Sequence, residues 1–266
     1  MFNKVFKYDF KYVFRFWWIY AVSTFGVSVL SGLLLRYIIG FFNSPNPTEI
    51  GGVIGALCIL GFMATVFSIA LLPAAASIGC AVRYYKNFFS DEGYLTFTLP
   101  VSRTTLLNSK IVNDIAFSVI SLLILLIDAL IIIFIGCPPL YLEDAISALN
   151  HIHLSAEQSI SIVLAVLAMA ASLLMGICVL FLSITIGSVI SKNHKVLAGI
   201  GVYYGITAIL SGIQQLFSLL PNLAYIASPT PSAIVYLLFA IFLYLAFGLG
   251  AYFVNLYCLK NKLNLN

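Results

Sequence analysis

The sequence predicts an all-α integral membrane protein with six transmembrane helices. Of its 266 residues, 62% are hydrophobic and only 8% are charged, against about 25% charged residues in an average soluble protein. So few charged side chains cannot coat a soluble protein of this size. Six apolar stretches also reach the length of about 20 residues that a helix needs to cross a bilayer. Composition and the length of these stretches together predict the fold class.

The six expected spans differ in length, and several exceed the minimum, which predicts tilted, kinked or projecting helices. They are Trp17–Phe42, Gly51–Ala81, Leu106–Gly136, Ser159–Ile190, Val196–Leu220 and Ala233–Leu259. Pro73 should kink or locally open the second span, because proline lacks the amide hydrogen that a helix uses. No internal repeat or low-complexity linker separates the spans, so we expect residues 1–266 to form a single transmembrane domain.

Basic residues lie on alternate connections between the spans, which predicts the orientation in the membrane. One set of connections carries Lys4, Lys7, Lys11, Arg15, Arg83, Lys86, Arg103, Lys110, Lys192, Lys195, Lys260 and Lys262. The other set carries Glu49, Glu143, Asp144 and Glu157 and no basic residue. Cytoplasmic loops collect lysine and arginine. We therefore expect a multi-pass protein of the cell (plasma) membrane with both termini and residues 83–105 in the cytoplasm.

The first 16 residues have the pattern of an amphipathic helix. At 100° per residue, aromatic and apolar side chains share one side of this helix and basic ones share the other. The apolar side holds Phe2, Phe6, Phe10, Val13 and Trp17, and the basic side Lys4, Lys7, Lys11 and Arg15. We favour a helix that lies in the membrane interface, with lysines toward anionic lipid headgroups. The alternative is an ordinary basic flank that only sets the topology.

The sequence indicates no catalytic or metal-binding residues. The five cysteines are scattered, and no cysteine and histidine cluster has the spacing of metal ligands. His151 and His153 could hold a metal, but no further ligands accompany them. No HExxH or GxSxG motif and no phosphate-binding loop occurs. The chain should therefore not hydrolyse ATP itself and should bind no cofactor of its own. The net charge of +4 says little about nucleic acid, which we do not expect as a partner.

The stretch "DEGYLTFTLPVSR", residues 91–103, is the most polar part of the chain and predicts a short helix, a break and a new long helix. Asp91 and Glu92 suit the positive end of a helix dipole, and Gly93 permits a tight approach or an unusual backbone angle. Pro100 should end the short helix, and Ser102 is a candidate N-cap for the next one. The apolar residues between them are Tyr94, Leu95, Phe97 and Leu99. Such an element suits docking on a partner protein; the alternative is an ordinary connecting loop.

Residues 91–110, "DEGYLTFTLPVSRTTLLNSK", resemble the segment after the second span of type-2 ATP-binding-cassette (ABC) transporter permeases, most of all the small six-span permeases of Gram-positive anaerobes. The family pattern is an acidic residue followed by glycine, leucine-rich positions, P-x-S-R and a later lysine. It falls on Glu92, Gly93, Leu95, Leu99, Pro100, Ser102, Arg103 and Lys110. In that family this segment is the coupling helix, which transmits the motion of the ATPase to the spans.

The resemblance implies a membrane-spanning permease subunit, and we expect an exporter. Two permease chains, identical or paralogous, would work in the lipid membrane with two ATPase subunits that bind ATP and magnesium. ATPase docking is expected on Asp91, Glu92, Gly93, Tyr94, Leu95, Phe97, Leu99, Pro100 and Arg103. The turn at 191–195 would be a second, minor contact, and residues 219–232 a re-entrant segment or a plain outer loop. The alternatives are a non-transporting sensory or immunity subunit, a secondary transporter and an intramembrane enzyme.

Four polar residues within the spans fall at similar heights in the outer half of the bilayer: Arg36, Asp128, Gln214 and Gln215. A charge at the bilayer centre costs at least about 2.5–3.5 kcal/mol on insertion scales. We expect a polar intramembrane layer in which Arg36 and Asp128 pair or line the exit path. Arg36 could instead extend to the outer headgroups. Asp128 should face protein or water.

Two glycine pairs with GxxxG spacing predict close approach of helices. They are Gly51 with Gly55 in the second span and Gly201 with Gly205 in the fifth. A seam between two permease chains is one use of such pairs, and packing within the chain is the other.

Overall fold

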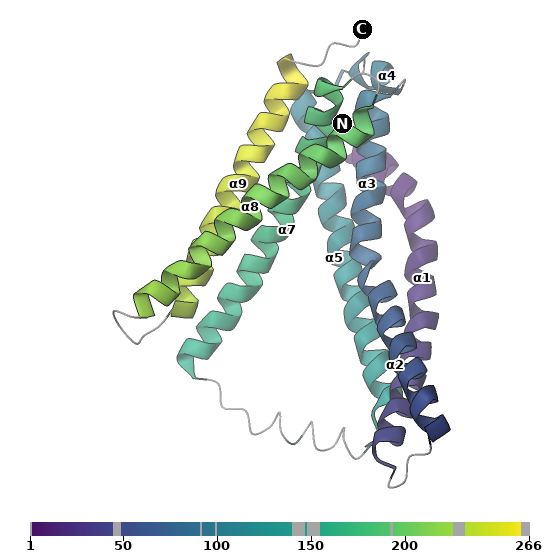
Figure 1. Cartoon of the computed structure of the whole chain (residues 1–266). Coiled ribbons are helices and arrows are strands. Elements are labelled where there is room, and N and C mark those ends of the chain that lie inside the picture. The colour runs from purple at the N-terminus through teal and green to yellow at the C-terminus, as the bar shows by residue number, and fades with distance from the viewer. Residues whose placement is uncertain are drawn as a thin grey trace. The chain divides into compact units, whose positions relative to one another are not determined.

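The computed structural model describes residues 2–44, 49–90, 92–98, 100–139, 147, 155–191, 194–225 and 232–261. Within these ranges all regular secondary structure is helical. The helices, labelled in Figure 1, are α1 (Phe2–Phe42), α2 (Glu49–Ala70), α3 (Leu72–Phe89), α4 (Glu92–Thr98), α5 (Arg103–Gly136), α7 (Ala156–Ile190), α8 (Lys195–Tyr225) and α9 (Ser232–Asn261).

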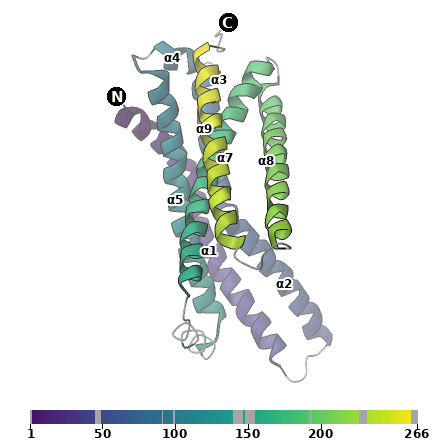
Figure 2. The same ribbon diagram turned by 90° about the vertical axis from the view of Figure 1, so that its left-hand side faces the viewer.

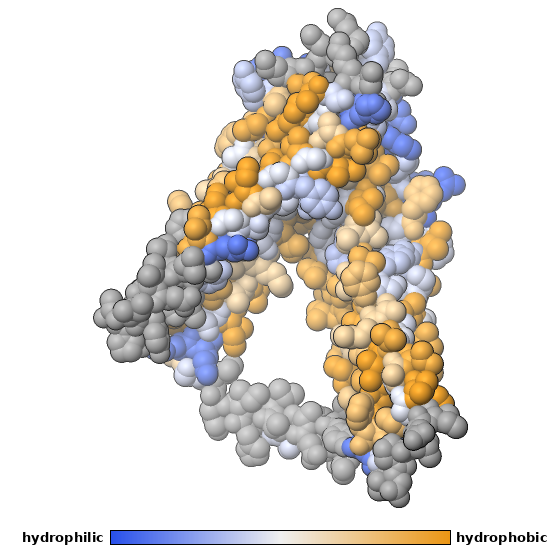
Figure 3. Space-filling view, in the orientation of Figure 1, coloured by the Kyte–Doolittle hydropathy of each residue, from blue (hydrophilic) through white to orange (hydrophobic). Residues whose placement is uncertain are grey.

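The prediction of an all-α membrane protein with six spans is confirmed. Six helical stretches of the described chain are long and apolar enough to cross a membrane: Phe2–Phe42, Gly51–Phe89, Arg103–Gly136, Ala156–Ile190, Lys195–Leu216 and Ile234–Asn261. Large hydrophobic side chains stand exposed along them, such as Phe67 on α2 and Ile209 on α8, 67% and 65% exposed. Figure 3 shows such side chains over the visible faces of α2 and α8. Exposed apolar surface on this scale needs lipid around it.

The second span contains the kink that Pro73 predicts. α2 ends at Ala70 and α3 begins at Leu72, with a turn at Leu71 between them. Pro73 has no amide hydrogen to donate, and its ring crowds the carbonyl four residues before it. Hydrogen bonding resumes directly afterwards, since the amide of Ala75 donates to the carbonyl of Leu71 (2.9 Å).

The amphipathic amino-terminal segment is helical, but no break separates it from the first span. α1 runs without interruption over 41 residues. The four basic side chains of the amino-terminal segment, Lys4, Lys7, Lys11 and Arg15, are exposed, whereas Val13 and Trp17 are buried. The faces are thus divided as predicted. The interfacial position of residues 1–16 stays a prediction.

Contacts divide the chain into two compact units. Unit 1 comprises Met1–Asp9, Cys80–Ile115 and Leu154–Asn266, and unit 2 comprises Phe10–Gly79 and Ala116–His153. Three long helices, α1, α3 and α5, contribute residues to both units. The prediction of a single transmembrane domain stays a prediction.

In unit 1, α7 packs along α9 and α8, as Figures 1 and 2 show. A Ser155 and Gln158 capping box starts α7, which satisfies amide hydrogens that a helix start leaves free. Val179 and Leu182 of α7 meet Leu210 of α8 and Ala251 of α9 in a buried core. Gly187 and Gly199 bring α7 and α8 so close that a Cβ on Gly187 would collide with the Gly199 backbone.

In unit 2, α1 packs against α5 through small residues and aromatic rings. The ring of Phe117 lies 4.7 Å from that of Phe10 and 5.3 Å from that of Trp17. At the other end, a Cβ on Gly32 would lie 2.8 Å from the Cβ of Ile135. A Cβ on Gly136 would lie 2.7 Å from Leu35. The two helices therefore interlock without room for another methyl group.

The predicted start of the segment after the fifth span needs correction. α8 continues as helix to Tyr225, so the segment predicted from residue 219 as a loop or re-entrant element begins later, and Pro221 lies inside a helix. Proline is a weak loop signal in membrane helices, because neighbouring groups can satisfy the freed backbone. Residues 226–231 lie outside the described part of the chain.

The GxxxG pairs behave differently from each other. On α8, Gly201 and Gly205 are exposed, and a Cβ on either would meet nothing within 4 Å. They therefore make no close helix contact in the described part of this chain. Gly55 of α2 does make one, since its Cβ would lie 3.2 Å from the ring of Phe41.

Candidate functional site

The short helix between the second and third spans is present where the sequence predicts it. α4 begins at Glu92, which supplies the acidic residue of its first turn, and it ends at Thr98, two residues before Pro100. Ser102 caps α5, because its hydroxyl oxygen accepts from the amide of Thr105 (3.2 Å) and its carbonyl from that of Leu106 (3.1 Å). The predicted order of short helix, break and long helix is confirmed.

Gly93 lets α4 fold back closely onto the end of α3. It is buried, and its amide donates to the carbonyl of Ser90 (2.8 Å). A Cβ on Gly93 would lie 2.9 Å from the carbonyl oxygen of Phe88, closer than real side chains approach. The close approach expected of Gly93 is therefore confirmed, and it is made to α3.

The inner side of α4 rests on an aromatic ring and an arginine. The Phe97 ring lies 5.6 Å from that of Phe88, which is fully buried. The guanidinium of Arg103 lies 5.4 Å from the Phe97 ring, within the range of a cation–π contact. These contacts join α4 to both of its neighbouring helices.

Arg103 also binds the end of α9. Its Nη1 donates to the carbonyl oxygens of Leu259 and Lys260, the latter at 2.7 Å. The last carbonyls of a helix lack partners within it, and a cation at that end is favourable. Arg103 was predicted as an ATPase-docking residue; in the structure its side chain joins α4, α5 and α9 within the chain.

The outer side of α4 carries the exposed members of the predicted docking set. Tyr94 is 68% exposed, and Glu92 and Pro100 are also exposed. Asp91 and Leu99 lie outside the described residues, as does the side chain of Leu95. The described segment therefore has an anchored inner side, formed by Gly93, Phe97 and Arg103, and an open outer side with Tyr94 at its centre.

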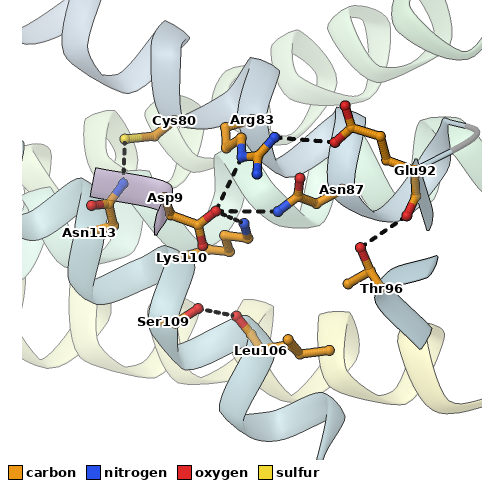
Figure 4. A network of polar contacts seen from close by, with 10 residues as sticks. All are labelled: Asp9, Cys80, Arg83, Asn87, Glu92, Thr96, Leu106, Ser109, Lys110 and Asn113. Atoms are coloured by element: carbon orange, nitrogen blue, oxygen red, sulfur yellow. Dashed lines mark hydrogen bonds and ion pairs between the residues drawn. The ribbon is translucent and has the colours of Figure 1, made fainter. Parts of the chain in front are cut away.

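Beside α4 lies a group of charged and polar side chains, which we call the Asp9 cluster: Asp9, Arg83, Asn87, Glu92 and Lys110 (Figure 4). Asp9, Asn87 and Lys110 are buried, and Glu92 is exposed. Asp9 Oδ1 lies 2.6 Å from Lys110 Nζ, 3.2 Å from Arg83 Nε and 3.3 Å from Asn87 Nδ2. Asp9 and Lys110 are 2% and 3% exposed. One carboxylate oxygen thus gathers three donors from α3 and α5.

Arg83 connects this buried group to α4. Its Nη1 lies 3.2 Å from Oε2 of Glu92, the first residue of α4. The four charges of Asp9, Glu92, Arg83 and Lys110 cancel. Burying a charge is favourable only when it is paired and hydrogen-bonded, so the buried Asp9 and Lys110 depend on each other, whereas Glu92 is 55% exposed. The cluster therefore ties the start of α1, the end of α3 and the start of α5 to the first turn of α4.

Sequence reasoning missed the central residue of this cluster. Asp9 is the only acidic residue in the basic segment that precedes Trp17, and that isolation was the available signal. Lys110 was noted as a topology marker and as the last residue of the family pattern. In the structure its ammonium group is buried against Asp9.

A second buried polar group ties α3 to α7 and α9. The Tyr84 hydroxyl lies 2.7 Å from Thr185 Oγ1 and donates to Asn255 Oδ1 at 3.1 Å. All three residues are at most 1% exposed. Their hydrogen bonds satisfy groups that would be costly to bury alone, so they fix the end of α3 that carries α4.

The turn predicted as a minor second contact also meets α3. Lys195, the first residue of α8, donates from Nζ to the carbonyl oxygen of Phe89 (3.2 Å), the last residue of α3. Lys192 and Asn193 lie outside the described residues. The described part of this turn thus braces the helix from which α4 departs.

The expected intramembrane polar layer is not brought together within either unit. Arg36 and Asp128 belong to unit 2, and Gln214 and Gln215 to unit 1. Arg36 is exposed and Asp128 is fully buried, and no ion pair joins them among the described residues. The pairing of Arg36 with Asp128 is therefore not formed. A role of either residue in a transport path stays a prediction. His151 and His153 lie outside the described residues.

Comparison with protein-family models, with curated proteins and with solved structures finds no match to this chain.

Proposed function

We propose that this chain is the membrane-spanning permease subunit of an ABC exporter, driven by a separate ATPase that docks on residues 91–103. The observation that carries the proposal is the construction of α4. It presents Tyr94 and Glu92 outward, while Gly93, Phe97 and Arg103 hold it to α3, α5 and α9. A force applied to such an element is passed to the spans, because its base has little freedom to slide.

The Asp9 cluster supports this role. A coupling element must move with the helices that it drives, and the ion pair of Glu92 with Arg83 connects α4 to the buried Asp9 and Lys110. The ion pair itself lies at the surface, since Glu92 is 55% exposed, and exposed pairs contribute only about 0–1 kcal/mol. Its connection through Arg83 to the buried Asp9 and Lys110 favours a coupling element over a simple surface loop, which tolerates change.

Two features of the sequence support a separate ATPase subunit. The chain has no phosphate-binding loop, so an ATP-driven cycle requires another polypeptide. The distribution of basic residues favours a cytoplasmic position for α4, where ATP is present. We propose that two such permease chains assemble with two ATPase subunits in the cell membrane. Gly201 and Gly205 are exposed on α8, and their GxxxG spacing would permit a close contact between the two chains.

The test is co-purification of the full-length tagged chain from its native cell in a mild detergent, followed by mass spectrometry and an ATPase assay. We expect a stoichiometric partner with a phosphate-binding loop and ATPase activity. Tyr94→Ala should reduce its recovery at least tenfold, because exposed aromatic residues often dominate binding. The matched control is Tyr8→Ala, since Tyr8 is 71% exposed but lies on α1; it should leave recovery unchanged.

The alternatives give other outcomes. A chain that purifies without an ATPase and transports without ATP is a secondary transporter. A chain that binds the ATPase but whose ATP turnover does not respond to any exported compound is a sensory or immunity subunit.

A further inference from the structure

Asp128 is an acidic residue of the third span that has no charged partner in the part of the chain that the structure describes. It is 0% exposed, and neither of its carboxylate oxygens has a hydrogen-bond partner among the described residues. The basic residues of unit 2 are Lys11, Arg15 and Arg36, and all three are exposed. Asp128 is also the only acidic residue whose side chain is described in that unit.

Hydroxyl groups of α1 surround the carboxyl group. Thr24 and Ser28, one helical turn apart on α1, place their side chains beside Asp128. Both are buried, 1% and 0% exposed. Each hydroxyl donates its hydrogen to its own helix: Thr24 to the carbonyl of Ala21 (2.7 Å) and Ser28 to that of Phe25 (2.8 Å). With their hydrogens so directed, the two hydroxyl oxygens can accept a hydrogen bond from the carboxyl group; the same hydroxyls would donate to a carboxylate if they rotated.

Burial without a charged partner among the described residues favours a carboxylic acid here over a carboxylate. A carboxylate only accepts hydrogen bonds, whereas the protonated group has one O–H to donate. An isolated charge in an apolar medium is so costly that the group is neutralised instead, and acidic residues inside a membrane often mark proton relays. The hydroxyl oxygens supply acceptors for that one O–H.

We propose that Asp128 is a proton-binding site, a carboxylate that takes one proton from water to become a neutral acid donating to Thr24 or Ser28. The site depends on the packing of α1 against α5. Gly32 and Gly136 lie about two turns further along these helices and interlock with Ile135 and Leu35. That contact keeps water from the carboxyl group, so separation of α1 from α5 would release the proton. This inference does not rest on the proposed function.

Infrared difference spectroscopy of the full chain in lipid nanodiscs tests the proposal. At neutral pH the wild type should show the C=O stretching band of a protonated carboxylic acid, shifted in D2O. Asp128→Asn should remove this band and keep the thermal stability, because the amide is neutral and has the same shape. Thr24→Val with Ser28→Ala should move the band to higher frequency. A carboxylate at neutral pH, with or without sensitivity to added sodium, would overturn the proposal.

The dependence on helix packing has its own test. Gly136→Ala adds a methyl group where Leu35 lies 2.7 Å away, so it should part the helices and let the acid band disappear at a lower pH than in the wild type. Gly40→Ala is the control, because a Cβ there meets nothing within 4 Å. Equal titration of the two variants and the wild type would refute the link to packing.

Discussion

The carboxylate of Asp9, near the start of the chain, lies 2.6 Å from the ammonium group of Lys110 in the third span. Both side chains are almost completely buried, and Arg83 and Asn87 share the same carboxylate oxygen. The pair is thus the centre of the cluster that holds the first turn of α4.

Asp9→Asn should destabilise the protein strongly. It leaves Lys110 and Arg83 without their shared countercharge, and breaking a buried ion pair on one side costs about 3–5 kcal/mol. Unfolding of the purified chain in detergent, followed by circular dichroism, measures the loss. Lys7→Ala is the control, because Lys7 is exposed on the same helix and surface changes usually stay within about 0.5 kcal/mol.

The same pair predicts strong coupling between its members. Asp9→Asn combined with Lys110→Met removes both buried charges, so the double variant should lose clearly less stability than the two single variants together. Strictly additive losses would show that the Asp9 and Lys110 side chains do not depend on each other.

Gly93→Ala should loosen α4. The added methyl group would lie 2.9 Å from the Phe88 carbonyl oxygen, and overpacking of this kind costs about 1–3 kcal/mol. Hydrogen exchange of the amides in residues 92–98 should become faster. Gly52→Ala, where nothing lies within 4 Å, should be neutral or stabilising, because alanine favours a helix by about 1 kcal/mol over glycine. Equal amide exchange of residues 92–98 in the Gly93→Ala and Gly52→Ala variants would contradict the close packing of Gly93 against Phe88.

Arg103→Lys should not replace arginine. The guanidinium reaches two carbonyl oxygens of α9 and the Phe97 ring at once, and lysine lacks this planar group with several donors. Faster hydrogen exchange at residues 257–261 is expected in Arg103→Lys and more so in Arg103→Ala. An Arg103→Lys variant that exchanges like the wild type would mean that charge alone holds the end of α9.

Tyr84→Phe should cost about 1–3 kcal/mol, because it leaves buried groups of Thr185 and Asn255 short of a hydrogen-bond partner. Thermal unfolding of the full chain measures this effect. Tyr94→Phe, which also removes a hydroxyl group but on an exposed ring, should leave the unfolding temperature unchanged. The same shift in both variants would contradict the role of the buried hydroxyl group.

Local chemistry explains the parts of the fold that could be predicted. Apolar length determines the spans, Pro73 removes a helix hydrogen bond, and Ser102 caps the helix that follows it. A close approach at Gly93 could also be predicted, because glycine has no side chain. The sequence did not show that this approach is to Phe88. Each of these features depends on residues that are close in the sequence.

The features that could not be predicted depend on pairing between distant helices. Asp9 reads as one acid in a basic segment until α3 and α5 bring Arg83 and Lys110 to it. Arg36 and Asp128 have opposite charges and similar heights in the membrane, yet Asp128 faces hydroxyl groups of α1. Height along a helix can be counted from a sequence, but the direction in which a side chain points depends on how the helices pack.

The central claim, that the outer side of α4 docks an ATPase, is tested most directly by site-specific crosslinking in the native cell. A photoreactive phenylalanine derivative replaces Tyr94 in one sample and Tyr8 in the other, and the crosslinked products are identified by mass spectrometry. If an ATPase docks on α4, we expect a crosslink from position 94, and none from position 8, to a polypeptide with a phosphate-binding loop. Crosslinks from position 94 only to lipid, or to a protein without such a loop, would contradict it.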